Sequence, residues 1–590
     1  MFDIHYKKNN NQTLFKCLAE NDFFKVQNYI PLYKNFFSLD ENNFNNINLN
    51  HKNHIYSFKK TETNNVFDCN ILNNKCKLRK LSFFKLSPLI DPVKFMIGKF
   101  KNINNDTILQ LPDLNNTTLE RLQDINNASY VDSFFSYLTS MLLNTYNIPH
   151  CIDFYGSFLS IKKNLKVNIV DDIDYLYDST FFHKNKNSLF DVENIDLALL
   201  NNEDTRKYKK KINIADTTTD DLIIDELNNE QLNKVFKKNN DIDLLTENNV
   251  KIHNSLIFES SNNNKESSKQ TNSRCSSRTS RTTENSSDNS MDEDDEDDET
   301  SEDESENSCE LSEMTIDTDI EINATFQNFP VQVICLEKMD NTLDSLMDDD
   351  FSITKNEWKS ILFQVIMTLI IYQKAFDFTH NDLHTNNIMY VETDKKYLYY
   401  KFNNSYYKVP TYGKLYKIID FGRSIYKFRN KIFCSDSYSK KGDASSQYNC
   451  EPYFNKNKAR LEPNKSFDLT RLGCSLFDYF FEDIDNFENI NDPVSKLIIE
   501  WCTDDNGRNI LYKKNGDERY PDFKLYKMIA RTVHNNIPQT QVSKDIFNKF
   551  QTTGRQIKSK KSKIINIDKL PSYVTFKNTN TIMEKGEVHY

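Results

Sequence analysis

Two short polar segments constrain this chain more than any other part of its 590 residues. The first, residues 380–387, reads HNDLHTNN, and the second, residues 418–422, reads IIDFG. Asp382 and Asn387 are five residues apart, a spacing that allows a catalytic loop to turn back on itself. The Asp-Phe-Gly sequence follows an apolar β-run, so Asp420 is expected at the end of a strand. We therefore expect two carboxylates and one amide to meet at one point of the fold.

This set of polar groups suits phosphoryl transfer. The γ-phosphoryl group passes through a loose transition state, so an enzyme contributes mostly positioning and charge neutralisation. Asp382 is the candidate catalytic residue for the acceptor hydroxyl, and Asn387 and Asp420 are candidate ligands for Mg²⁺. ATP and Mg²⁺ are the cofactors that the pattern predicts.

A long amphipathic helix is expected to lead into the first segment. The apolar residues that recur at helical spacing are Leu362, Val365, Ile366, Leu369 and Ile370. A membrane span is the alternative, but Gln364, Thr368 and Gln373 interrupt the run well short of the ~20 residues that a bilayer requires. After the loop, residues 388–391 predict a strand and residues 466–481 predict an apolar helix.

On these motifs, the chain resembles the eukaryotic-like protein kinases, most closely the divergent Ser/Thr protein kinases of giant (nucleocytoplasmic large) DNA viruses. The resemblance also rests on residues 82–89 (SFFKLSPL) and 518–526 (ERYPDFKLY), and it covers two pieces, residues 75–165 and 325–540. It implies an α+β, bilobal protein-kinase-like fold with a small β-rich N-lobe and a larger helical C-lobe. The implied activity is transfer of the γ-phosphoryl group of ATP to Ser/Thr hydroxyls of protein substrates.

The resemblance also suggests roles for residues around the catalytic loop. Asp468 would anchor the loop backbone, with His380 in support; the alternative is that Asp468 is a helix N-cap. His384 stands two residues after Asp382, where most protein kinases have Lys, and is a further candidate catalytic residue.

Lys85, at the end of a β-like run, is the candidate for the lysine that binds the α- and β-phosphates, with Lys80 as the alternative. Asp132 is the only acid in the next long helix and could pair with this lysine, or it could merely favour the helix N-terminus electrostatically. By resemblance, the hinge follows the strand at residues 329–337. There the Glu337 carbonyl and the Met339 amide would bond the adenine edge.

Three departures from the kinase pattern leave other functions open. No glycine precedes Lys85, so Asn64-Asn65 or Asn73-Asn74 would have to replace the glycine-rich phosphate loop, since Asn tolerates positive φ. Asn381 replaces the Arg that reads activation-loop phosphate, so control by such phosphorylation is not expected. His384 also occurs in haspin-like and aminoglycoside-phosphotransferase-like kinases. A small-molecule phosphotransferase and a nucleotide-binding pseudokinase are therefore the alternatives.

Residues 166–323 are predicted to form a disordered insertion, rich in Ser and Arg and then in acids, because few large apolar side chains offset the ordering entropy. It contains eight consecutive acids, residues 292–299, beside Ser301, Ser305 and Ser308. The insertion is either a docking or phosphorylation segment or a solvated spacer between two strands. Without those eight acids the net charge of −11 becomes −3, which provides no basic footprint for specific nucleic-acid binding.

The expected domain order follows from these segments. It is an Asn-rich N-terminal extension (1–60), the first part of the N-lobe (61–165), the insertion (166–323), the end of the N-lobe with the hinge (324–340), the C-lobe (341–545) and a C-terminal tail (546–590). The 11 Cys include no Cys-x-x-Cys pair, and the first residues do not resemble a signal peptide. We expect a reducing, intracellular compartment: host cytoplasm, or a virion if the protein is viral.

Overall fold

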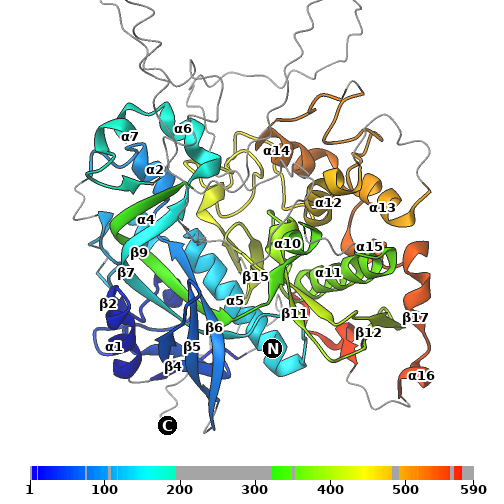
Figure 1. The fold of residues 1–590 in the computed structure, drawn as a ribbon, viewed down its shortest axis with the longest axis horizontal. Helices are drawn as coiled ribbons and strands as arrows, with labels where there is room; N and C mark the ends of the chain where they lie inside the picture. The colour runs from blue at the N-terminus through cyan, green and yellow to red at the C-terminus, as the bar shows by residue number, and fades with distance from the viewer. Residues whose placement is uncertain are drawn as a thin grey trace, which may run out of the picture.

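The computed structural model describes residues 3–8, 11–73, 76–103, 108–115, 117–193, 322–348, 353–481, 491–514, 516–521, 523–558 and 564–573. This part of the chain has a mixed α+β fold, as the sequence predicts. A curled antiparallel sheet occupies the left of Figure 1, and most of the long helices lie to its right.

The sheet has seven strands in the order β2-β7-β9-β6-β5-β4, with β8 paired to β9. The strands are β2 (Phe23–Gln27), β4 (Asn53–Lys60), β5 (Val66–Asn73), β6 (Cys76–Pro88), β7 (Phe154–Asn168), β8 (Asp191–Val192) and β9 (Asn323–Glu337). Residues 329–336 of the central strand β9 are buried without interruption, and Gln332 is the one polar side chain among them. The β6–β9 register places Lys85 opposite Ile334.

Helix α5 (Ala128–Tyr146) packs on the sheet and connects it to the helices. Asn127 caps the helix by accepting a hydrogen bond from the Ser129 backbone, as short polar side chains do at this position. The buried ring of Phe135 lies 5.3 Å from the ring of Tyr372 and 4.7 Å from that of Phe421, centroid to centroid. These aromatic contacts fix the helix against the segment that carries Asp420.

The helical part is built around α11, which is buried along most of its length. Its helices are α10 (Leu343–Asp348), α11 (Lys355–Phe376), α12 (Phe467–Phe480), α13 (Pro493–Trp501), α14 (Phe523–Thr532) and α15 (Pro538–Gln541). Thr354 and Glu357 form a capping box at the start of α11. Of the helices in the described ranges, none combines the length and apolar character that crossing a bilayer requires.

Smaller sheets accompany these helices. They comprise β10 (Asn341–Thr342), β11 (Ile388–Glu392) and β14 (Lys414–Ile418) in one sheet, β12 (Tyr397–Phe402), β13 (Ser405–Pro410), β17 (Gln551–Thr552) and β18 (Ile565–Asn566) in another, and the pair β15 (Ile425–Phe428) and β16 (Lys431–Cys434). The sheet that contains β12 and β13 was not predicted. It includes strands of the predicted C-terminal tail, which therefore packs on the helical part in its described residues.

The domain boundaries also need correction. The predicted boundary after residue 60 falls between β4 and β5, which pair with each other, so residues 1–60 contribute strands to the main sheet. The predicted start of the insertion at residue 166 falls inside β7. Residues 170–193 form further short elements with Phe182 and Phe190 buried, while residues 194–321, with the acidic run and the predicted disorder, lie outside the described residues.

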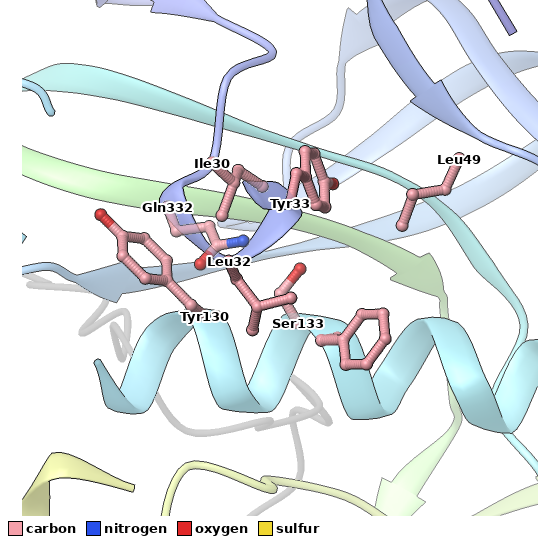
Figure 2. Close-up of a pocket in the computed structure, with 8 residues that line it drawn as sticks. Ile30, Leu32, Tyr33, Leu49, Tyr130, Ser133 and Gln332 are labelled. Atoms are coloured by element: carbon pink, nitrogen blue, oxygen red, sulfur yellow. The ribbon is translucent and has the colours of Figure 1, made fainter. Parts of the chain in front are cut away.

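The remaining elements are short. They are β1 (Tyr6–Lys8), α1 (Gln12–Glu20), η1 (Pro31–Asn35), β3 (Ile47–Leu49), α2 (Pro92–Met96), α4 (Glu120–Gln123), η2 (Val170–Asp172), α6 (Ile173–Tyr177), α7 (Thr180–Asn185), η3 (Thr385–Asn387), η4 (Asp436–Tyr438), η6 (Asp545–Phe550), α16 (Gly554–Lys558) and η7 (Ile567–Lys569). Figure 2 shows residues of η1, including Leu32, above α5 next to Tyr130 and Ser133. The cavity between them measures about 10 Å³, far too small for a nucleotide, so it is not a candidate substrate site.

Candidate active site

Lys85 lies between two carboxylates that come from distant parts of the chain. Its Nζ is 2.7 Å from Asp132 Oδ2 and 2.8 Å from Asp420 Oδ1. The second Asp132 oxygen, Oδ1, accepts a hydrogen bond from the backbone of Phe421 at 3.1 Å. Strand β6, helix α5 and the Asp-Phe-Gly segment therefore meet at this lysine.

Charge and burial compete in this cluster. The side chains of Lys85 and Asp132 are 21% and 3% exposed, whereas that of Asp420 is 46% exposed. Burial alone would lower the pKa of Lys85, because it disfavours the charged ammonium. The negative charges of Asp132 and Asp420 outweigh this effect, so the pKa of Lys85 is raised. Burial would also raise the pKa of Asp420, yet Lys85 offsets this and lowers that pKa to about 2. For Asp132, burial prevails over the attraction of Lys85 and raises the pKa.

The geometry does not support Lys80 as the phosphate-binding lysine. Lys80 is exposed on β6, with its Nζ 5.7 Å from the centroid of the Tyr155 ring. The alternative role of Asp132, favouring the helix N-terminus, also fits less well, because its two oxygens are bonded to Lys85 and Phe421. The structure thus pairs Lys85 with the acid that the sequence named.

The loop at residues 380–387 is folded so that its polar side chains support one another. Asn387 Nδ2 donates a hydrogen bond to the Asp382 carbonyl at 2.8 Å and lies 3.0 Å from His384 Nε2. Burial lowers the pKa of His384 to about 4, so a neutral ring can accept from the amide. Both amide hydrogens of Asn387 are then used, and its Oδ1 is the atom that can face a ligand.

Asp468, on α12, anchors the start of this loop. Its buried carboxylate accepts hydrogen bonds from the backbone nitrogens of His380, at 3.0 and 3.1 Å, and of Asn381, at 2.9 Å. Ser466, two residues earlier, is the residue that precedes the helix, so Asp468 is not the N-cap. The carboxylate of Asp468 is needed here because the two buried backbone N–H groups would otherwise lack a hydrogen-bond acceptor.

Hydrogen bonds also link the loop to the Asp-Phe-Gly segment. His380 Nε2 lies 2.8 Å from the Ile419 carbonyl, and the Ile419 nitrogen donates to the Asn387 carbonyl at 3.0 Å. Asp420, next in the chain, has a positive φ of 61°. A non-glycine residue in this conformation is uncommon, and such strain concentrates at functional sites.

The candidate metal ligands are oxygen atoms of the chemical type that binds Mg²⁺. Asp420 provides a half-exposed, ionised carboxylate, and Asn387 provides an amide oxygen from a segment that is hydrogen-bonded to the one that carries Asp420. Mg²⁺ is usually bound by one or two protein oxygens together with substrate phosphates and water. Within the ranges that the structure describes, no group of three or more His, Cys, Asp or Glu could hold a metal by itself.

Asp382 is held by residues that sequence reasoning did not single out. Tyr526, on α14, donates a hydrogen bond to Asp382 Oδ1 at 2.8 Å, and Arg423 Nε lies 3.9 Å from Asp382 Oδ2. Burial alone would raise the pKa of Asp382. Neighbouring groups, of which the Arg423 guanidinium has the largest effect, outweigh burial, so the pKa of Asp382 is lowered. Arg423 also pairs with Asp443 at 2.5 Å. In the sequence, Tyr526 is only the last residue of the segment 518–526 that carries the resemblance, and Arg423 is signalled only by its place after Gly422.

The predicted hinge residues follow β9. Glu337 is the last residue of that strand, and its carboxylate accepts a hydrogen bond from the Asp153 backbone at 2.9 Å and pairs with Lys417. Met339 is buried. The side chain of Glu337 is thus engaged within the protein.

The turn between β4 and β5 lies next to Lys85. The Asn65 carbonyl accepts a hydrogen bond from the Phe84 nitrogen at 2.8 Å, and Asn65 has a φ of 56°. Of the two asparagine pairs suggested as replacements for a glycine-rich loop, Asn64-Asn65 therefore occupies the turn beside the candidate phosphate-binding lysine. Asn73 ends β5, and Asn74 lies outside the described residues.

Comparison with known proteins gives short stretches of similarity to protein kinases. The chain is 42% identical to a probable serine/threonine-protein kinase of Dictyostelium discoideum over 112 residues, which is 16% of this chain and 9% of that protein. It is 36% identical to a putative serine/threonine-protein kinase of Acanthamoeba polyphaga mimivirus over 104 residues, 15% of this chain and 26% of that protein.

A third similarity is to the serine/threonine-protein kinase haspin of Mus musculus, with 36% identity over 63 residues, 11% of this chain and 8% of haspin. The chain spans less than a third of the length of each of these relatives. No protein-family model matches it. Partial matches to serine/threonine kinases from an amoeba, a virus and a mammal indicate a kinase-like relationship.

Proposed function

We propose that this chain is an ATP-dependent serine/threonine protein kinase with a bilobal, protein-kinase-like fold. The observation that carries the proposal is the position of Lys85 between Asp132 and Asp420, at 2.7 and 2.8 Å. Active protein kinases require a lysine on a strand to pair with an acid on a helix while the Asp-Phe-Gly aspartate faces the metal. Here the helix acid is Asp rather than Glu.

In this proposal each polar side chain has one task. Lys85 binds the α- and β-phosphates of ATP, Asp420 and Asn387 hold Mg²⁺, and Asp382 receives the proton of the acceptor hydroxyl. Mg²⁺, when bound, neutralises charge on the phosphates. The lowered pKa of Asp382 supports its task, because the carboxylate is then ionised and able to accept a proton at neutral pH.

Protein hydroxyls are proposed as acceptors because the partial relatives are named serine/threonine-protein kinases. The bilobal description is supported by the sheet and the helical part that meet at Lys85 and α5. The adenine would lie against the backbone at Glu337 and Met339.

The test is transfer of radiolabelled γ-phosphate from ATP to generic protein substrates by the full chain and by Asp382→Asn. We expect transfer by the unaltered chain and a loss of at least about tenfold in kcat for the variant, equivalent to ~1.4 kcal/mol of barrier. ATP affinity should stay nearly the same, because Asp382 does not hold the metal. Asp478→Asn, which changes an aspartate bonded to Tyr512 outside the site, is the matched control.

Two results would contradict the proposal. ATP binding without transfer to any acceptor would favour a pseudokinase, and transfer only to a small-molecule acceptor such as an aminoglycoside would favour a small-molecule phosphotransferase. A variant that kept more than a tenth of the parent kcat would show that Asp382 is not the catalytic residue.

A further inference from the structure

Tyr526 makes the shortest hydrogen bond to the proposed catalytic carboxylate. Its hydroxyl lies 2.8 Å from Asp382 Oδ1, although 144 residues separate the two in sequence. Tyr526 comes from α14, which packs on α12 (Figure 1). The bond is buried, since both side chains are almost entirely shielded from solvent.

The direction of this hydrogen bond follows from a third residue. Arg471 Nε donates to the Tyr526 hydroxyl at 3.0 Å, and an arginine nitrogen can only donate. The tyrosine oxygen therefore accepts from Arg471, and its single proton goes to Asp382 Oδ1. A bond fixed in this way holds the carboxylate in one orientation.

The ring of Tyr526 is also held in place. Its centroid lies 5.2 Å from the Arg471 guanidinium and 5.8 Å from that of Arg423, and the ring stacks on Phe523 at 5.3 Å. Arg423 in turn lies near the other carboxylate oxygen, 3.9 Å from Asp382 Oδ2. The two oxygens of Asp382 thus have different surroundings: Oδ1 is bonded to a tyrosine, and Oδ2 faces a guanidinium at a distance too long for a hydrogen bond.

We propose that Tyr526 is a positioning residue that engages Asp382 Oδ1 and leaves Oδ2 to receive the proton of the acceptor hydroxyl. The inference rests on the proposed kinase function. As the proton moves to Oδ2, the acceptor oxygen forms a bond to the γ-phosphorus, and the bond from that phosphorus to the β,γ-bridging oxygen breaks, which releases ADP. The acceptor therefore approaches beside Arg423.

The experiment compares the unaltered chain with Tyr526→Phe, which keeps the ring and removes the hydroxyl. Tyr512→Phe is the matched control, because the Tyr512 hydroxyl bonds another aspartate, Asp478 Oδ1, at 2.9 Å outside the site. We measure kcat and the KM for ATP as a function of pH. For Tyr526→Phe we expect kcat to fall about tenfold, as one hydrogen bond to a charged group allows, with an unchanged KM for ATP.

The pH profile separates positioning from general structural support. A hydrogen bond donated to an ionised carboxylate lowers its pKa, so Tyr526→Phe should move the acid limb of kcat to higher pH. The other charged or titratable groups around Asp382 include Arg423, His384, Arg471, His380 and Tyr438, and all are retained in this variant. Arg471→Lys, which removes the Nε donor while keeping the charge, should shift the limb in the same direction and serves as a second variant if the first does not fold.

Three results would overturn the inference. An unchanged kcat and acid limb in a folded Tyr526→Phe variant would remove the positioning role while leaving the kinase proposal intact. A higher kcat would mean that Tyr526 occupies the place of the acceptor. Absence of transfer by the unaltered chain would overturn the proposed function, and this inference with it.

Discussion

Lys85 Nζ and Asp132 Oδ2 lie 2.7 Å apart, in a partly buried ion pair between strand β6 and helix α5. The pair joins the main sheet to the helix that packs on it, and Asp420 makes a second contact with the same ammonium. Lys85 therefore links the main sheet, helix α5 and the Asp-Phe-Gly segment.

Asp132→Asn should lower kcat/KM for ATP, because Lys85 loses a charged partner that fixes its position. A hydrogen bond between charged groups contributes about 1.5–3 kcal/mol, so kcat/KM for ATP should fall roughly tenfold to hundredfold. Steady-state kinetics at varied ATP measure this. Lys80→Ala, at an exposed lysine on the same strand, is the control and should have no such effect.

Asp420→Ala and Asn387→Ala should each raise the Mg²⁺ concentration needed for half-maximal activity, since Mg²⁺ requires hard oxygen ligands. Magnesium titrations of the activity measure the change. Asn386→Ala, at the neighbouring asparagine, should titrate like the unaltered chain. Identical curves for all variants would rule out these two residues as metal ligands.

Asp468→Ala should destabilise the fold as well as the activity. The backbone N–H groups of His380 and Asn381 would lose their acceptor inside the protein, which costs about 1–3 kcal/mol for each buried group. Denaturant unfolding measures the loss. Asp468→Asn keeps one acceptor oxygen and should be less destabilising; equal stability of Asp468→Ala and the parent would show that the anchor contributes little.

The free energy of unfolding should fall as pH decreases from about 7 towards 4. Burial lowers the pKa of His54, His150 and His384 to about 4, below the ordinary value near 6.5, so the unfolded chain binds protons first. The stability from each neutral histidine is complete above pH 6.5 and is lost as pH falls towards the folded pKa. Each should account for about 2 kcal/mol of that loss by pH 5.

His150→Gln isolates one of these contributions, because the ring lies within hydrogen-bonding distance of the Tyr416 carbonyl and the Tyr400 hydroxyl. Urea unfolding at several pH values should give a shallower slope for this variant. His183→Gln, at an exposed histidine, is the control variant. A His150→Gln slope equal to the parent slope would contradict the buried, neutral state.

Replacing residues 195–320 with a short Gly/Ser linker should preserve the fold and the activity on a generic substrate. The ends are close, because the Glu193 nitrogen donates to the Asn323 carbonyl at 3.0 Å, and loop-closure entropy changes slowly with length. A deletion that begins at residue 170 should instead be destabilising, since it removes the buried Phe182 and Phe190. Thermal unfolding compares the two.

If the acidic run docks a protein substrate, the variant that lacks residues 195–320 should behave differently with different substrates. Turnover of a generic peptide would be kept, and phosphorylation of the native partner would fall, most strongly at low salt, where charges act over a longer Debye length. Insoluble protein after the shorter deletion would mean that residues 195–320 contribute to the core.

The sequence alone determined the local features of this protein. The helical spacing of apolar residues predicted α11, and the two motifs predicted a loop and a strand end with Asp382, Asn387 and Asp420. These features depend on residues within a few turns or one strand, so a periodic pattern or a fixed spacing is enough to indicate them.

The tertiary structure decided the long-range partners. Asp132 as the partner of Lys85, Tyr526 as the donor to Asp382, and the sheet formed by β12, β13, β17 and β18 all join segments that are distant in sequence. No spacing rule relates such residues, because their contact depends on how helices and strands pack around a shared core. For the same reason the sequence could offer Asp132 only as one of two interpretations, and the packing of α5 against β6 and the Asp-Phe-Gly segment selected between them.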